Sequence, residues 1–207
     1  MLEKKGSGHR PTLTELARKW MSWLLEPLAR LINRTGISPN LLTVIGFVLM
    51  VGVAYVLATG HLQIGGVLII LAGTFDALDG TLAQLAGRKS RFGAFLDSTM
   101  DRLSEAVIYL GLLVHYTRQG GQQESFLIYA TIVGSLMVSY ARARAEGLGI
   151  ECKRGILTRF ERVAVLVIGL ILDQMLIALW ILAVLSNFTA LQRIYHVWRD
   201  TGGEKGG

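Results

Sequence analysis

Long apolar stretches, separated by short polar segments, run along most of the chain from residue 40 onward. A helix that spans a bilayer needs about 20 predominantly apolar residues, and six stretches approach or exceed that length. They cover residues 40–60, 62–86, 94–117, 124–146, 160–175 and 176–197, with only Asp173 and Gln174 to divide the last two. The pattern predicts an all-α integral membrane protein, built as a bundle of six transmembrane helices.

The segment before this bundle has a different pattern. Between residues 12 and 35 apolar residues recur every three to four positions, Trp20 and Trp23 among them, and basic residues lie between them. This is typical of an amphipathic helix in the membrane interface, although a helix packed in a soluble cap would have a similar pattern. We therefore expect a cytoplasmic N-terminal arm with an interfacial amphipathic helix at 1–36, a six-helix transmembrane domain at 37–199 and a flexible tail at 200–207.

Composition and charge agree with this topology. The chain has 207 residues, of which 52% are apolar, and its mean hydropathy of +0.46 is high for a soluble domain. With six helices, Arg118 is the only one of 21 Lys and Arg residues in a loop on the far side of the membrane. The positive-inside rule then places both termini in the cytoplasm, in a multi-pass protein of the plasma membrane.

The net charge of +6 indicates contact with anionic membrane lipids and with phosphate-bearing substrates. Nucleic acid is not expected as a partner, because the sequence has no module that combines aromatic and basic residues for binding it. The single cysteine, Cys152, cannot form an internal disulfide.

Two pairs of carboxylates stand out within the apolar stretches. Asp76 and Asp79 are three residues apart, Asp97 and Asp101 are four apart, and a short hairpin joins their helices. Each pair therefore shares one face of its helix, and all four carboxylates can converge. Such acids are costly in a membrane unless they share a partner, and a site with oxygen ligands alone favours Mg²⁺ or Mn²⁺. The sequence thus predicts metal-assisted chemistry on a phosphate at a membrane surface.

The spacing across residues 76–101 is D-x2-D-G-x2-A-x9-G-x3-D-x3-D. Its fixed positions are Asp76, Asp79, Gly80, Ala83, Gly93, Asp97 and Asp101. This motif closely resembles that of the CDP-alcohol phosphotransferases, also called CDP-alcohol phosphatidyltransferases, and the six-helix pattern extends the resemblance over nearly the whole chain. Gln84 departs from the family, which usually has Arg there. Either nucleotide affinity is lower, or Arg88, Lys89 or Arg91 compensates.

The resemblance implies a transferase that uses CDP-diacylglycerol, and it also implies a homodimer. Two divalent ions on Asp76, Asp79 and Asp97 would hold the donor's pyrophosphate. Asp101, which is also a possible metal contact, would be the general base: it takes the proton of an acceptor hydroxyl, which attacks the phosphorus that keeps the lipid and expels CMP. The implied nucleotide and donor contacts are Pro39, Asn40, Leu41, Leu42, Gly80, Ala83, Gln84, Ser90 and Gly93.

Clustered arginines predict the kind of acceptor. They are Arg142, Arg144, Arg159, Arg162 and Arg193. Because guanidinium groups bind phosphate bidentately, they favour an acceptor with its own phosphate, such as inositol 1-phosphate or glycerol 3-phosphate. This downstream basic pattern resembles the bacterial phosphatidylinositol-phosphate synthases, which commonly have Lys at the position of Arg142, and the resemblance implies inositol 1-phosphate first, with glycerol 3-phosphate as the alternative. The alternative is that these arginines only set topology and bind lipid headgroups.

The directions of Arg142 and Arg144 and the partner of Glu105 depend on local helix geometry. Arg142 and Arg144 would point about 200° apart on a straight helix, so they share a pocket only if the helix ends or unwinds there; Glu146 could then orient one of them. Glu105 continues the face of Asp97 and Asp101 by one turn. It would either support the site as a hydrogen-bond acceptor or pair with Arg102.

Other classes of function are less favoured. An ion-coupled transporter could use four membrane carboxylates, but the sequence has no visible repeat and places the acids on two adjacent helices near the cytoplasm. The presence of Asp101 argues against a scaffold protein without catalytic activity. An ether-lipid donor in place of CDP-diacylglycerol stays open, because the pocket for lipid tails is merely apolar.

Overall fold

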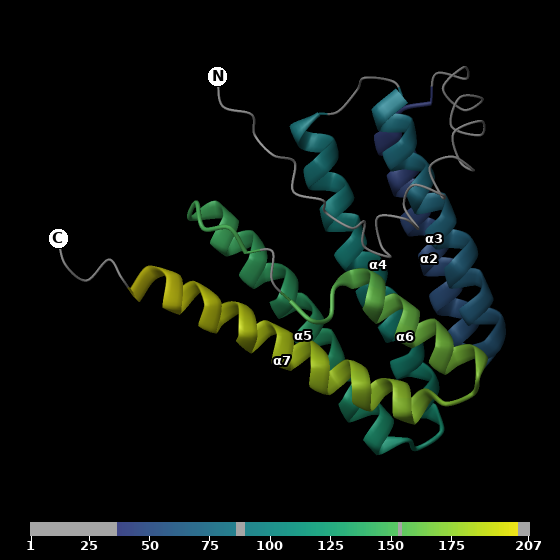
Figure 1. Ribbon diagram of the computed structural model, residues 1–207. Helices are drawn as coiled ribbons and strands as arrows, with labels where there is room; N and C mark the ends of the chain where they lie inside the picture. The colour runs from purple at the N-terminus through teal and green to yellow at the C-terminus, as the bar shows by residue number, and fades with distance from the viewer. Residues whose placement is uncertain (1–36, 86–89, 153–154, 203–207) are drawn as a thin grey trace, which may run out of the picture. The chain divides into compact units, whose positions relative to one another are not determined.

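The computed structural model describes residues 37–85, 90–152 and 155–202, with the side chains of 76–85 left out (Figure 1). Its described residues form helices and turns and no strand. The helices are α2 (Pro39–Ala58), α3 (Leu62–Leu85), α4 (Arg91–Arg118), α5 (Gln122–Gly147), α6 (Arg159–Ile171) and α7 (Met175–Thr201). The prediction of an all-α protein is confirmed. The amphipathic helix predicted between residues 12 and 35 lies outside the described residues.

Local sequence explains where the first helices begin and end. Pro39 occupies the first position of α2, where its missing N–H is not needed, and Ser38 Oγ accepts a hydrogen bond from the Leu41 N–H at 3.2 Å. Ser38 is therefore the residue that caps α2. Gly60 and Gly120 follow the ends of α2 and α4 with φ of +92° and +76°, a backbone conformation that glycine adopts without strain.

Two helix ends differ from the sequence prediction. The turn after α6 begins at Leu172, so α6 ends at Ile171 and has 13 residues, whereas the apolar stretch continues to residue 175. Asp173 adopts a positive φ of 54° in that turn, which Asp tolerates better than most residues. At the other end of the chain, α7 continues to Thr201, two residues into the expected tail.

The described residues belong to two compact units. The first contains residues up to Gly46 and Gly73–Asp97, and the second contains Phe47–Ala72 and Ser98 onward. The first unit therefore holds Asp97, the helical backbone of Asp76 and Asp79, and the beginnings of α2 and α4. The second holds Asp101 and all five candidate arginines.

The second unit has an apolar core, and two of its helices, α5 and α7, pack closely against each other. Leu57, Leu112 and Leu179 are fully buried in it. The helices α5 and α7 lie side by side in Figure 1, and Asn187 of α7 donates to the carbonyl oxygen of Ala130 at 2.9 Å. Small residues allow such close approach between helices in membranes.

The helices also carry much exposed apolar surface. Tyr55, Phe126 and Leu191 are each more than 60% exposed. By length and hydropathy, α2, α5 and α7 can each cross a bilayer, and α3 begins with a shorter apolar segment, Leu62–Phe75. An apolar outer surface on long apolar helices is the arrangement that a lipid environment requires.

Gly134 gives a test of this packing. A Cβ atom at Gly134 would lie 2.7 Å from Asn187 Nδ2 and 2.9 Å from its backbone N, so Gly134→Ala should force α5 and α7 apart. We expect the free energy of unfolding to fall by about 1–3 kcal/mol, the usual effect of overpacking, measured by thermal unfolding in detergent. Gly147→Ala in the same helix is the control, because its Cβ would meet no atom within 4 Å. Equal stability of the two variants would contradict this packing.

Candidate active site

Asp101 and Arg159 form an ion pair in the second unit. Nη1 of Arg159, the first residue of α6, lies 2.6 Å from Oδ1 of Asp101 on α4. The Arg159 side chain is 35% exposed, and the Asp101 side chain is 17% exposed. The predicted general base and one predicted phosphate-binding arginine are thus in direct contact, at a position that solvent can reach.

One helical turn further along, Glu105 and Arg162 form a second ion pair. Arg162 Nε donates to Glu105 Oε1 at 2.6 Å and Nη2 donates to Oε2 at 2.8 Å, the bidentate geometry of a strong guanidinium–carboxylate pair. Their side chains are only 2% and 8% exposed. Arg162, predicted from sequence to bind the acceptor phosphate, is therefore engaged by a protein carboxylate.

The partner of Glu105 corrects one alternative from the sequence. Arg102 donates to the Ser98 carbonyl oxygen instead of pairing with Glu105. The spacings in the sequence are compatible with the observed pairing: Asp101 and Glu105 are four apart, Arg159 and Arg162 are three apart, and both spacings put two residues on one helix face.

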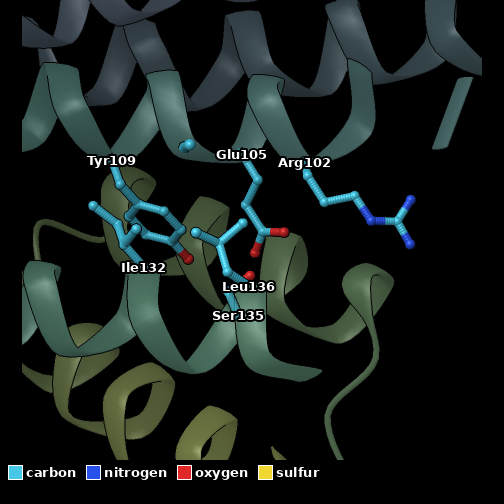
Figure 2. A pocket seen from close by; sticks show the side chains of 7 residues that line it. Arg102, Glu105, Tyr109, Ile132, Ser135 and Leu136 are labelled. Carbon is cyan, nitrogen blue, oxygen red and sulfur yellow. The ribbon is translucent and has the colours of Figure 1, made fainter. Parts of the chain in front are cut away.

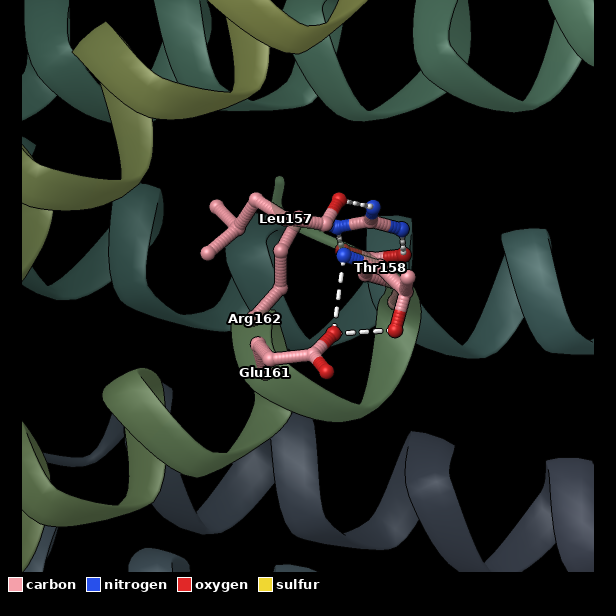
Figure 3. A network of polar contacts seen from close by, with 5 residues as sticks. Leu157, Thr158, Glu161 and Arg162 are labelled. Atoms are coloured by element: carbon pink, nitrogen blue, oxygen red, sulfur yellow. Dashed lines mark hydrogen bonds and ion pairs between the residues drawn. The ribbon is translucent and has the colours of Figure 1, made fainter. Parts of the chain in front are cut away.

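The beginning of α6 is fixed by polar contacts (Figure 3). Glu161 accepts hydrogen bonds from the backbone N–H of Thr158 at 2.8 Å and from its hydroxyl, as in a capping box. Arg162 Nη1 also donates to the carbonyl oxygen of Leu157 at 3.3 Å. These contacts set where α6 starts and hence where Arg159 stands.

A small cavity lies beside Glu105 (Figure 2). It is lined by Arg102, Glu105, Ala106, Tyr109, Ile132, Ser135 and Leu136. Its volume of about 10 Å³ is close to the minimum that one water molecule needs. A sugar phosphate cannot enter it, so this cavity is not the acceptor pocket.

The remaining candidate arginines lie on α5 and α7. The helix α5 ends at Gly147 with Leu148 as its C-cap, and Arg144 lies in its last turn. The helix end that a shared pocket requires therefore follows this pair directly, although Arg142 and Arg144 themselves are helical. Arg142 Nε donates to Glu146 at 2.7 Å, which confirms that Glu146 orients one of them. Arg193 is only 4% exposed and donates to the Val138 carbonyl oxygen at 2.6 Å, which links α7 to α5.

In the first unit, three predicted donor contacts lie together. Ser90 Oγ accepts a hydrogen bond from the Gly93 N–H at 2.8 Å. A Cβ atom at Gly93 would lie 3.0 Å from Ser90 Oγ and 3.1 Å from Asn40 Oδ1. The beginnings of α2 and α4 therefore meet at Asn40, Ser90 and Gly93, and helix N-termini favour phosphate groups.

The other predicted donor contacts are only partly described. Pro39 begins α2, Leu41 is 50% exposed and Leu42 is 3% exposed. Gly80, Ala83 and Gln84 belong to α3, and the structure describes only their backbone.

The predicted metal ligands lie on the helices that the sequence predicted. Asp76 and Asp79 belong to α3, and Asp97 and Asp101 belong to α4. Among the side chains that the structure describes, no three His, Cys, Asp or Glu gather at one point, but those of Asp76 and Asp79 are not described. The convergence of all four carboxylates stays a prediction. Their oxygen-only chemistry fits Mg²⁺ or Mn²⁺.

These features define an all-helical membrane protein with an acidic motif on α3 and α4 and an acidic–basic pair between α4 and α6. The chain belongs to the CDP-alcohol phosphatidyltransferase family, whose sequence profile matches residues 36–194. The resemblance noted from the motif is therefore confirmed, and the protein is an enzyme of the transferase class.

Curated relatives and solved structures agree with this family. The chain is 37% identical to the archaetidylinositol phosphate synthase of Pyrococcus horikoshii, over 83% of this chain and 89% of the relative. It is 34% identical to the phosphatidylinositol phosphate synthase of Mycobacteroides abscessus, over 90% and 89%. The crystal structure of the Mycobacterium tuberculosis phosphatidylinositol phosphate synthase with CDP-DAG bound superposes with a TM-score of 0.80 at 31% identity, covering 84% of this chain and 93% of that one. A second structure of that enzyme, in complex with manganese and citrate, has a TM-score of 0.78 at 31% identity and covers 84% of this chain and 88% of that one.

Proposed function

We propose that this protein transfers the phosphatidyl group of CDP-diacylglycerol to a hydroxyl of inositol 1-phosphate and releases CMP. The observation that carries this proposal is the contact of Arg159 with Asp101 at 2.6 Å, which joins a phosphate-binding group to a proton acceptor. The names of the relatives support an inositol phosphate acceptor. The CDP-DAG bound to the mycobacterial enzyme supports the donor.

Asp101 and Arg159 would divide the work on the acceptor. Asp101 takes the proton of the attacking hydroxyl; a bond forms between that oxygen and the phosphorus that keeps the lipid, and the bond from this phosphorus to CMP breaks. Arg159 binds the acceptor's own phosphate and so places the hydroxyl beside Asp101. Arg142, Arg144 and Arg193 remain candidates for further phosphate contacts.

The donor would be held by the motif on α3 and α4. Asp76, Asp79, Asp97 and Asp101 would supply carboxylate oxygens for two ions of Mg²⁺ or Mn²⁺. When bound, such ions neutralise the pyrophosphate and polarise its phosphorus. The manganese in the complex of the mycobacterial enzyme supports this assignment.

Gly93→Ala tests the donor site. Its Cβ would lie 3.0 Å from Ser90 Oγ and 3.1 Å from Asn40 Oδ1, so both side chains, which are proposed nucleotide contacts, would have to shift by a few tenths of an ångström. We expect the KM for CDP-diacylglycerol to rise about 5- to 30-fold, equivalent to about 1–2 kcal/mol, with little change in the acceptor KM. Gly52→Ala is the control, since its Cβ meets no atom within 4 Å. A Gly93→Ala enzyme with normal donor KM would remove Gly93 from this site.

We also propose a membrane topology for the chain. The six helices form a bundle in the plasma membrane, with an interfacial amphipathic helix before them, both termini and the site in the cytoplasm, and two chains in a homodimer. With 13 residues, α6 is shorter than the ~20 residues of a full span. Within the part of the chain that the structure describes, three helices are long and apolar enough to cross a bilayer. The positive charge on one side of the six-helix topology supports the orientation.

Acceptor profiling tests the proposed function. Purified protein, CDP-diacylglycerol and Mg²⁺ or Mn²⁺ are incubated in parallel with inositol 1-phosphate, glycerol 3-phosphate, free inositol or serine, and CMP release is measured. We expect the fastest release with inositol 1-phosphate and almost none with the unphosphorylated acceptors. Faster release with glycerol 3-phosphate would instead indicate phosphatidylglycerol-phosphate synthesis.

An ether-lipid donor is a second candidate, favoured by the 37% identity to an archaetidylinositol phosphate synthase. The same assay with a CDP-activated ether lipid decides between the two donors. A kcat/KM at least tenfold higher for the ether-linked donor would assign the enzyme to archaetidyl transfer.

A further inference from the structure

Two ion pairs connect α4 to α6 as successive rungs. Asp101 and Glu105 lie one turn apart on α4, and their partners Arg159 and Arg162 lie one turn apart on α6. We infer that the Glu105–Arg162 pair positions Arg159 against Asp101, so that Glu105 and Arg162 are positioning residues for acceptor binding. This inference rests on the proposed function, in which the Asp101–Arg159 pair meets the acceptor.

Burial separates the roles of the two rungs. The Asp101 and Arg159 side chains are 17% and 35% exposed, so a substrate can reach them. Glu105 and Arg162 are 8% and 2% exposed, and the cavity beside Glu105, of about 10 Å³, has room for no more than one water molecule. We call the buried Glu105–Arg162 pair the inner rung and the partly exposed Asp101–Arg159 pair the outer rung. The inner rung therefore acts on the acceptor only through the outer rung.

The outer rung needs this support. A partly exposed ion pair is weak on its own, because solvent screens it and both side chains lose rotamer freedom. The ion pair between Arg159 Nη1 and Asp101 Oδ1 is of this partly exposed kind. A second, buried pair one turn along on both helices would therefore hold the guanidinium more firmly than the exposed pair does.

The inner rung supplies direction as well as attraction. Two parallel hydrogen bonds from Arg162 to Glu105 set the rotation of α6 about its axis, because a bidentate pair tolerates little twist. Arg162 Nη1 also donates to the Leu157 carbonyl oxygen, and the Leu157 N–H donates to Thr189 Oγ1 of α7 at 3.3 Å. The start of α6, and with it Arg159, is tied to both α4 and α7.

Glu105→Gln is the first test, in the full-length enzyme. It removes the charge that faces Arg162 and should let the start of α6 shift, and a misplacement of about 1 Å can reduce a rate by about 10²-fold. We expect kcat/KM for the acceptor to fall 10- to 100-fold, mainly through a higher acceptor KM, with the donor KM unchanged. Unchanged acceptor kinetics, or an equal rise of both KM values, would overturn the inference.

Two further variants separate positioning from a merely structural role. Asn187→Ala is the control: it removes a hydrogen bond between α5 and α7 in which neither Glu105 nor Arg162 takes part, and it should lower thermal stability without changing the acceptor KM selectively. Glu105→Asp keeps the charge and should recover part of the activity lost in Glu105→Gln. A selective effect in Asn187→Ala, or no recovery in Glu105→Asp, would count against positioning.

A charge swap separates positioning from direct binding by Arg162. The double variant Glu105→Arg/Arg162→Glu keeps the pair but removes the cation from α6. If Arg162 only positions α6, the swap should exceed Arg162→Glu in acceptor kcat/KM by at least tenfold. If both are equally defective, Arg162 binds the acceptor phosphate itself and the inference fails. Should the swap not fold, Glu105→Gln against Asn187→Ala decides.

The kinetics are measured with whichever acceptor the wild type uses fastest. A preference for glycerol 3-phosphate would then refute the proposed function while leaving the rungs testable. Normal use of inositol 1-phosphate by Glu105→Gln would refute the rungs while leaving the function intact.

Discussion

Removal of divalent cations by a chelator should abolish CMP release, and Asp97→Asn should reduce it by about 10²-fold or more. Without a cation, the four motif carboxylates of the proposed site would repel both one another and the pyrophosphate of the donor. A metal ion contributes several kcal/mol to stabilising charge on a phosphoryl group, and each ~1.4 kcal/mol corresponds to a tenfold change in rate. The measurement is the initial rate of CMP release with chelator, and after Mg²⁺ or Mn²⁺ is added back in excess.

Asp200→Asn provides the matched control. Asp200 is an acidic residue of α7 that pairs with His196 and Arg199, and its removal should leave turnover and metal dependence unchanged. Size-exclusion chromatography and thermal unfolding establish that Asp97→Asn is folded. Full activity in the presence of chelator, or in folded Asp97→Asn, would eliminate the metal site.

The helices could be predicted from sequence because a lipid environment imposes a simple rule. Backbone polar groups must be satisfied within each segment, so a long apolar stretch has to be a helix. The stretch 124–146 accordingly became α5 (Gln122–Gly147). Hydropathy does not detect a turn made by residues such as Leu172, however, and the early end of α6 at Ile171 was missed for that reason.

The carboxylates of the site were predictable, but the pairing partners were not. Spacings of three and four placed Asp76, Asp79, Asp97 and Asp101 on two helices because helical periodicity is local. The contact between Asp101 and Arg159 joins helices that are distant in sequence. A pattern of charges reports how many cations lie near the cytoplasm, and not which carboxylate each one meets.

Arg162 illustrates the same limit. From the sequence alone, an arginine near a helix end is expected to face solvent or to bind phosphate, because burying its charge without a partner would be very costly. The structure buries it against Glu105 instead, where the opposite charge and two hydrogen bonds offset the loss of water. The matched three- and four-residue spacings on α6 and α4 are compatible with this pairing, but they do not single it out, because many charged residues in helices have such spacings.

Asp101→Asn should lower turnover by about 10²–10⁴-fold, the usual contribution of a general base, while binding of CDP-diacylglycerol stays largely intact. The amide keeps the shape of the carboxylate but cannot accept the hydroxyl proton at neutral pH. Donor affinity is measured by equilibrium binding, and turnover by CMP release at saturating concentrations of both substrates. If donor binding collapses and the remaining turnover follows donor occupancy, Asp101 acts chiefly as a metal ligand.

Arg159→Gln completes this test, because it alters the other member of the pair and leaves the carboxylate in place. If Arg159 binds the acceptor's phosphate, the acceptor KM should rise by about 10- to 150-fold, equivalent to the 1.5–3 kcal/mol of a hydrogen bond to a charged group, and kcat should fall less. If Arg159 instead serves only to orient Asp101, kcat should fall and the acceptor KM should stay the same. The two variants therefore test proton transfer by Asp101 and phosphate binding by Arg159 separately, since each role changes a different kinetic constant.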